Sequence, residues 1–168
     1  AQNSIGKDKL NAQPMLRGRI TEINNVKVEN LKVNKDVQWV LKRDRAFSWT
    51  NELPKKTKLL SGKWWPYNYD GPLLVSIGHK IAKGLKIKIG DKIKFNILGR
   101  NFEAKVFNTR ELLWENMNIN FIFILSKSRI ENAPHTWIAT TSTKNKIENN
   151  NFIEQIVNQF SNVSTISI

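Results

Sequence analysis

The fold is decided by residues 76–108, which read SIGHKIAKGLKIKIGDKIKFNILGRNFEAKVFN. Ser76 can cap a short helix, because its hydroxyl can accept a hydrogen bond from one of the first free backbone N–H groups. One apolar side of this helix is expected from residues that recur every four positions: Ile77, Ile81 and Leu85. Gly84 and Gly90 supply the backbone freedom needed to leave the helix and turn.

From Lys92 onward the apolar period changes from four to two. One side of the first alternating segment is apolar at Ile93, Phe95 and Ile97. The chain turns at Leu98-Gly99-Arg100 and returns with a second apolar set: Phe102, Ala104 and Val106. The pattern predicts a β-hairpin under a short helix, a unit that is too small to be stable alone.

The rest of the chain contributes further strands and a second helix. Asn24-Asn25 is a turn signal, and residues 36–49 are ambiguous between helix and strand, with the alternation of Val37, Trp39 and Leu41 favouring strand. Further strands are expected at Met15–Ile23, Val26–Val33, Pro72–Ile77, Phe121–Leu125 and His135–Thr143. A helix is expected at Asn149–Ser161, with Phe152, Ile156 and Phe160 on one face. The fold class is therefore α+β, a mixed, strand-rich domain with two clear helices.

The length of 168 residues fits one domain or two small lobes. Residues 1–13 are polar and without a sustained period, so we expect an N-terminal segment there and the folded domain over residues 14–168. The sequence begins without a methionine and ends in a strand-like run. These ends indicate a piece of a longer protein.

The composition is that of a globular domain with a strongly basic surface. Lys and Arg number 27 against 14 Asp and Glu, giving a formal charge of +13. Such a surface favours polyanions, whether nucleic acid, anionic lipid head groups or an acidic protein. There are no cysteines, which excludes disulfides and thiol-based metal sites. No apolar run approaches the roughly 18 to 20 residues that span a membrane.

No pattern of catalytic or metal-binding residues is visible. Gly62-Lys63 is followed by Trp64, so there is no phosphate-binding loop, and no Gly-x-Ser-x-Gly turn occurs. The two histidines, His79 and His135, lack metal-ligand spacing. His79 is expected to be exposed, and His135, directly after Pro134, to form a hydrogen-bonding corner. A small hydrolase using His135 would need a nearby acid or nucleophile that the sequence does not offer. We therefore expect no enzyme, no cofactor and no metal site.

Aromatic and basic residues lie close together between residues 55 and 69. The aromatic residues are Trp64, Trp65, Tyr67 and Tyr69, and the basic ones Lys55, Lys56, Lys58 and Lys63. Rings that stack on bases beside lysines that hold phosphates would make a single-stranded nucleic-acid-binding module, which is the alternative function. The same tryptophans could instead pack a core or lie at a membrane interface.

Several short motifs together carry a family resemblance. They are Pro14–Ile20 (PMLRGRI), Gly62–Pro66 (GKWWP), Leu74–Ser76 leading to Gly84-Leu85 and Gly90-Asp91, Asn96–Arg100 (NILGR), Arg110-Glu111, Trp114, Ile119–Phe121, Ala133–Thr136 (APHT) and Phe160–Ser164 (FSNVS). In this order the chain resembles the extracytoplasmic domain of an FtsX-like, MacB-type ABC transporter permease. It is most similar to the permease predicted to act with a lysophospholipase or arylesterase partner. The sequence departs from the family at Leu113, Asn118 and Trp137.

The resemblance implies a non-catalytic, MacB-type domain in the periplasm, held by transmembrane helices of a bacterial inner-membrane protein. ATP would be hydrolysed by a separate cytosolic ATPase subunit. Movement of the helices would move this domain, which would act on a lipid or lipoprotein-type substrate or on a periplasmic protein or lipid partner. The basic surface suits work near anionic lipid.

Seven residues are candidates for contacts with a substrate or partner: Arg17, Arg19, Trp64, Trp65, Arg110, Trp114 and His135. Each also has a purely structural interpretation. The arginines of the first strand can pair with Glu111 or Glu115, and the tryptophans can belong to the core.

Overall fold

The central hairpin has the geometry that the sequence predicts. Strands β6 (Lys92–Ile97) and β7 (Arg100–Arg110) pair antiparallel, with Ile97 opposite Arg100. The two residues between them, Leu98 and Gly99, have φ angles of 47° and 83°. A two-residue type I′ turn needs positive φ at both positions, so this turn matches the twist of the strands.

The computed structural model describes residues 11–112, 119–140, 146–159 and 162–164. The chain divides into two units. Gln13–Ile138 forms the larger one, which we call the barrel unit, and Ala1–Ala12 with Ala139–Ile168 forms the smaller one. In the smaller unit, α3 (Lys146–Gln159) is the helix expected near the C-terminus, with Ile156 buried as expected. The side chains of Phe152 and Phe160 lie outside the described residues.

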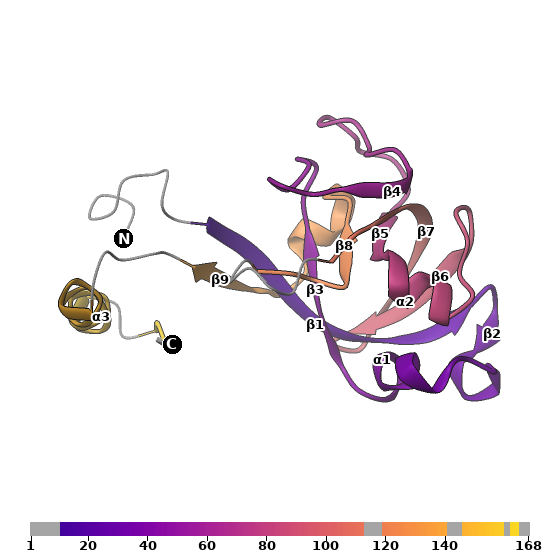
Figure 1. Cartoon of the computed structure of the whole chain (residues 1–168), viewed down its shortest axis with the longest axis horizontal. Coiled ribbons are helices and arrows are strands. Elements are labelled where there is room, and N and C mark those ends of the chain that lie inside the picture. Colours follow the sequence, from indigo (N-terminus) through magenta and orange to yellow (C-terminus); the bar gives the residue numbers. More distant parts are fainter. Residues whose placement is uncertain (1–10, 113–118, 141–145, 160–161, 165–168) are drawn as a thin grey trace. The chain divides into compact units, whose positions relative to one another are not determined.

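Six strands of the barrel unit pair in a closed ring (Figure 1). β1 (Asn11–Ile23) is antiparallel to both β3 (Arg45–Trp49) and β6. β3 runs parallel to β8 (Phe123–Leu125), and β8 is antiparallel to β5 (Leu74–Gly78). β5 runs parallel to β7, and the β6–β7 hairpin completes the ring. A ring of pairings without a break is a barrel, here with mixed strand directions.

Alternating side chains of these strands fill the barrel. The buried residues include Leu16 and Ile20 of β1, Val75 and Ile77 of β5, Ile93 and Ile97 of β6, and Ala104 and Val106 of β7. At the centre, the ring of Phe47 stacks on Phe95 at 5.2 Å and on Phe123 at 5.0 Å, measured between centroids. The three rings join β3, β6 and β8, so strands distant in sequence share one core.

The short helix predicted at residues 76–85 begins later than expected. α2 spans His79–Gly84, whereas Ser76 lies in β5, whose five residues are all buried. The prediction that Ser76 caps the helix is wrong, because pairing with β7 and β8 extends the strand through this residue. The chain leaves the helix through Lys86, with φ 59°, and not through Gly84. A Cβ on Gly84 would lie 2.6 Å from Val37, so glycine here allows close packing.

The stretch between β1 and β3 is more helical than the sequence pattern indicates. Asn24-Asn25 forms the expected turn, but β2 covers only Val26–Lys27 before a 3-10 helix at Val28–Asn30. The strand interpretation of residues 36–49 is wrong for the first half, which forms a 3-10 helix at Lys35–Val37 and α1 (Gln38–Lys42). Val37 and Val40, three apart, point into the core while Trp39 is exposed, as in a helix.

The remaining elements lie outside the ring. β4 (Leu59–Gly62) pairs with β7, and β9 (Thr136–Thr140) pairs with β1. A 3-10 helix covers Ser128–Asn132. The strand-rich mixture with a few helices confirms the α+β class. No helix in the described ranges is both long and apolar enough to span a membrane.

Candidate functional site

Arg110 lies inside the wall of the barrel. Its side chain is only 3% exposed, and it donates hydrogen bonds to the hydroxyl of Ser76 at 2.9 Å and to the backbone carbonyl of Phe121. Burial lowers the pKa of Arg110 to about 9, because the protonated form loses solvation. At neutral pH the guanidinium is still charged. In this position it joins β7, β5 and the segment before β8, and it is not available to a macromolecular partner.

Trp64 and Trp65 pack on the outer face of the barrel wall. Their rings stack at 4.2 Å, and the indole N–H groups donate to the carbonyls of Asn51 and Thr50, each at 3.0 Å. Trp65 is 2% exposed and forms a second apolar cluster with Leu74, Phe121 and Ile124. Trp64 is half-buried at the edge of this cluster.

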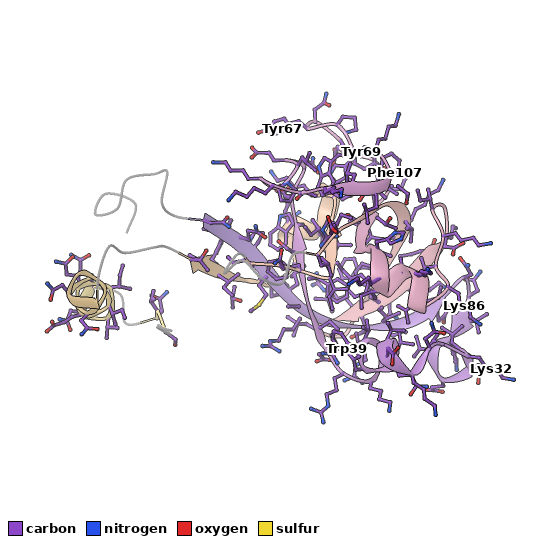
Figure 2. All side chains as sticks on the ribbon, in the orientation of Figure 1. Lys32, Trp39, Tyr67, Tyr69, Lys86 and Phe107 are labelled. Atoms are coloured by element: carbon purple, nitrogen blue, oxygen red, sulfur yellow. The ribbon has the colours of Figure 1, made fainter. Side chains whose placement is uncertain are left out.

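The segment that carries the two tryptophans is held by the loop after β3. The side chain amide of Asn51 donates to the carbonyls of Tyr67 and Tyr69, both at 2.9 Å. Figure 2 shows Tyr67 and Tyr69 near the upper edge of the barrel unit, with Phe107 just below them. Tyr67 is 74% exposed. The nucleic-acid alternative needs several free ring faces, and the stacked, largely buried Trp64 and Trp65 do not provide them.

Arg17 and Arg19 project from the outer face of β1 and line an open groove. We call it the arginine groove; its lining includes Arg17, Gly18, Arg19, Asp44, Leu98 and Gly99. Its volume is about 550 Å³. Arg19 Nε lies 3.0 Å from Asp44 Oδ1, so the expected partner, Glu111 or Glu115, is wrong for this arginine. Glu111 instead pairs with Lys58 at 3.6 Å.

His135 is exposed beside two indole rings. Its Nδ1 lies 2.9 Å from the carbonyl oxygen of Ala133, the hydrogen-bonded corner that the sequence predicts. Its ring meets Trp49 edge-on at 4.6 Å and Trp137 at 5.9 Å. Trp114 lies outside the described residues.

His79 is half-buried, and its Nδ1 lies 3.1 Å from the hydroxyl of Thr109, so the expectation that it is exposed is only partly met. Within the described ranges, no three His, Cys, Asp or Glu side chains gather as a metal site would require.

The structure thus brings together Arg17 with Arg19, and separately Trp64 with Trp65, while Arg110 is buried in the wall. Sequence reasoning missed Asp44, which lines the groove and pairs with Arg19. Asp44 is far from Arg19 in sequence, so only the pairing of β1 with β3 shows that they are neighbours. Chemically, the groove offers guanidinium groups to an anion.

Comparison with known proteins gives one informative similarity. No protein-family model matches the chain. No solved structure matches it significantly. The chain is 29% identical over 155 residues to the Escherichia coli (strain K12) protein described as an uncharacterized ABC transporter permease, YbbP. The matched region covers 92% of this chain and spans 18% of that protein. The similarity supports a relationship between this chain and ABC transporter permeases.

Proposed function

We propose that the chain is the extracytoplasmic domain of an FtsX-like, MacB-type ABC transporter permease, located in the periplasm and without catalytic activity of its own. The observation that carries this proposal is the similarity to the E. coli permease along 92% of the chain. That similarity spans 18% of the relative, which is the size of one domain within a much larger protein.

The fold supports a mechanical role. The ring of six strands around stacked Phe47, Phe95 and Phe123 makes the barrel unit a rigid body, since close-packed interiors transmit displacement without deforming. β1 and β9, which hold the two ends of the barrel unit, pair with each other. A pull on either end is therefore passed to the same side of the barrel.

In this proposal, a separate cytosolic ATPase subunit hydrolyses ATP, and the resulting movement of transmembrane helices displaces the barrel unit. The barrel unit then moves or extracts a lipid or lipoprotein-type substrate, or acts on a periplasmic partner. Arg17, Arg19, Trp64 and His135 are the candidate contact residues that remain on the surface. Trp65 and Arg110 act through the stability of the wall.

The test is to replace residues 13–138 with a flexible Gly-Ser linker in the longer protein, reconstituted with its ATPase subunit. We expect ATP hydrolysis to continue while movement of a fluorescent phospholipid out of the bilayer is lost. A matched control carries Lys80→Gln, an exposed residue of α2, and should behave as the unaltered protein. Equal lipid movement with and without residues 13–138 would contradict the proposal.

A further inference from the structure

A group of lysines projects from the end of α2 and from the loop that follows it. In the stretch KGLKIKI, residues 83–89, the three lysines are exposed, whereas the residues between them are buried. Lys83 and Lys86 are three residues apart across the end of the helix, and Lys86 and Lys88 flank a core residue, so all three point away from the core. We call these three lysines, together with Ile89 in the next turn, the lysine face.

The positive charge of the lysine face is largely uncompensated. Among the described residues, none of its three lysines has an ion-pair partner. The one carboxylate in residues 83–91 is Asp91. Its Oδ2 accepts a hydrogen bond from the backbone N–H of Lys88 at 2.8 Å. The lysines therefore outnumber the nearby carboxylate and are open to solvent.

A second segment brings a further lysine to this side of the barrel unit. The backbone N–H of Asn34 donates to the carbonyl of Gly84 at 3.2 Å, which holds the segment before α1 against the end of α2. Lys32, two residues earlier in this segment, is exposed. Figure 2 shows Lys32 and Lys86 on the same side of the barrel unit. The basic surface thus extends beyond one loop.

Lys86 occupies a backbone position that favours glycine. Its φ is 59°. The helix closes on two hydrogen bonds, from the N–H of Ile87 to the carbonyl of Ala82 at 2.8 Å and from the N–H of Lys86 to the carbonyl of Lys83 at 3.1 Å. This is a Schellman motif, in which the residue with positive φ is usually glycine. A lysine there is less stable than a glycine, because its Cβ is crowded in the left-handed conformation. Such a backbone outlier points to a use for the lysine other than stability.

Ile89 adds an apolar side chain beside the same charges. The N–H of Asp91 donates to the carbonyl of Lys88 at 3.2 Å, so Ile89 and Gly90 form the tip of a turn. The side chain of Ile89 is 47% exposed, at a position where polar residues and glycine are usual. The N–H of Gly90 donates to the carbonyl of Val106 at 2.8 Å, which fixes the tip against β7. The turn therefore presents an aliphatic side chain in a fixed place next to the lysines.

We propose that the lysine face docks on the surface of a bilayer that contains anionic lipid, with its lysines among the head groups and Ile89 reaching the boundary of the acyl chains. Lysines suit this partner, because an ammonium is a compact charge that attracts mobile phosphates without demanding a fixed geometry. Single-stranded nucleic acid is held in addition by rings that stack on bases, and the lysine face has no aromatic member. Contact at the level of the head groups leaves the ammonium groups in water. This docking goes beyond the proposed function and rests on it only in placing the barrel unit near a membrane.

The test is co-sedimentation of the complete 168-residue chain with phosphatidylcholine vesicles that either contain or lack one-third phosphatidylglycerol. The face variant changes the three lysines of the lysine face to glutamine. The matched control removes the same charge at three exposed lysines near β4, by Lys55→Gln, Lys56→Gln and Lys63→Gln. One lysine at an anionic surface changes partitioning by about fivefold at low salt, so we expect the face variant to bind anionic vesicles about a hundredfold more weakly. The control should stay within about threefold of the unaltered chain, since lysines away from the bilayer are screened.

Two single variants separate the contributions of charge, backbone and apolar contact. Lys86→Gly should weaken binding about fivefold and raise the midpoint of thermal unfolding by about 2–4 °C. Weaker binding by a more stable protein excludes unfolding as the cause. Ile89→Ser should weaken binding about threefold, and this effect should persist at high salt, where the charges are screened.

Several outcomes would overturn the docking. Equal weakening by the face variant and the control would show that binding reflects net charge alone. Equal binding to vesicles with and without phosphatidylglycerol, or binding to neither, would also contradict it. Tighter binding of a single-stranded oligonucleotide or of a glutamate-rich peptide, lost in the face variant, would assign the lysine face to that partner instead. These measurements use the isolated chain, so their failure is distinguishable from an unchanged movement of lipid by the permease that lacks residues 13–138.

Discussion

The guanidinium of Arg110 lies 2.9 Å from the hydroxyl of Ser76, and both side chains are buried in the barrel wall. The two residues belong to the parallel strands β7 and β5, whose register shifts between Val75 and Ser76. A second hydrogen bond, to the carbonyl of Phe121, adds the segment before β8. One side chain therefore satisfies polar groups of three neighbouring segments of the ring.

Arg110→Ala should destabilise the barrel unit. The change leaves the Ser76 hydroxyl and the Phe121 carbonyl without their donor and removes most of a large buried side chain. We expect a loss of about 2–3 kcal/mol in the free energy of unfolding, measured by urea denaturation. Arg17→Ala, at an exposed position of β1, is the control and should stay within about 0.5 kcal/mol. Similar values for the two variants would contradict the assigned role.

The lowered pKa of Arg110 predicts a pH effect with a definite sign. Below pH 9 the guanidinium is protonated in both the folded and unfolded states, so stability is unaffected by its titration. Between about 9 and the much higher ordinary pKa of an arginine, the unfolded state binds more protons, and a rise in pH then favours folding. The stability of the protein relative to Arg110→Met should therefore rise from pH 9 to 11, by up to about 1.4 kcal/mol per pH unit. Comparison with this variant cancels the titration of the lysines. A constant difference across this range would show that Arg110 stays charged in the folded state.

Trp64 and Trp65 should respond differently to truncation. Trp65→Ala empties a buried position in the second cluster and should cost about 3–5 kcal/mol. Trp64→Ala removes a half-buried ring and should cost roughly half as much, with the fold intact by circular dichroism. If the Trp64 variant instead unfolds as readily as the Trp65 variant, Trp64 is a core residue and not a contact.

Leu98→Asn should stabilise the hairpin. Asparagine adopts positive φ more readily than leucine, and Asn-Gly is the favoured pair for a type I′ turn. We expect a gain of about 0.5 kcal/mol, measured by thermal unfolding against Ile89→Asn, an exposed apolar residue outside the hairpin turn. A loss of stability would contradict the assigned turn geometry.

The sequence could predict those elements in which the local apolar period agrees with the strand pairing of the fold. Lys92–Ile97 and Phe102–Val106 alternate, a Gly-containing turn lies between them, and β6 and β7 form as expected. Ser76 is a favourable helix cap by sequence, but in the structure it belongs to β5. This strand forms through Ser76 because β7 pairs with every residue of β5 and β8 pairs on its other side. Residues 35–42 show a two-residue alternation by coincidence, since Val37 and Val40 are the residues that face the core.

Most of the candidate site was beyond sequence reasoning, because it depends on register. Arg17 and Arg19 stood out in sequence as a pair on one side of a strand. Asp44 joins them only because β3 pairs with β1, with Arg45 opposite Gly18. The sequence predicted Arg110 to be a contact residue, and no local sequence pattern indicates that this arginine is buried.

The location of the barrel unit outside the cytoplasm is the central claim, and cysteine labelling tests it most directly. The chain has no cysteine, so Lys86→Cys introduces a single exposed thiol in the longer protein once any cysteines elsewhere are replaced. Val106→Cys, at a fully buried position, is the control and should react only after unfolding. In cells with a permeabilised outer membrane and an intact inner membrane, we predict that a membrane-impermeant maleimide labels the cysteine at position 86. Labelling that requires rupture of the inner membrane would place the domain in the cytosol and contradict the account.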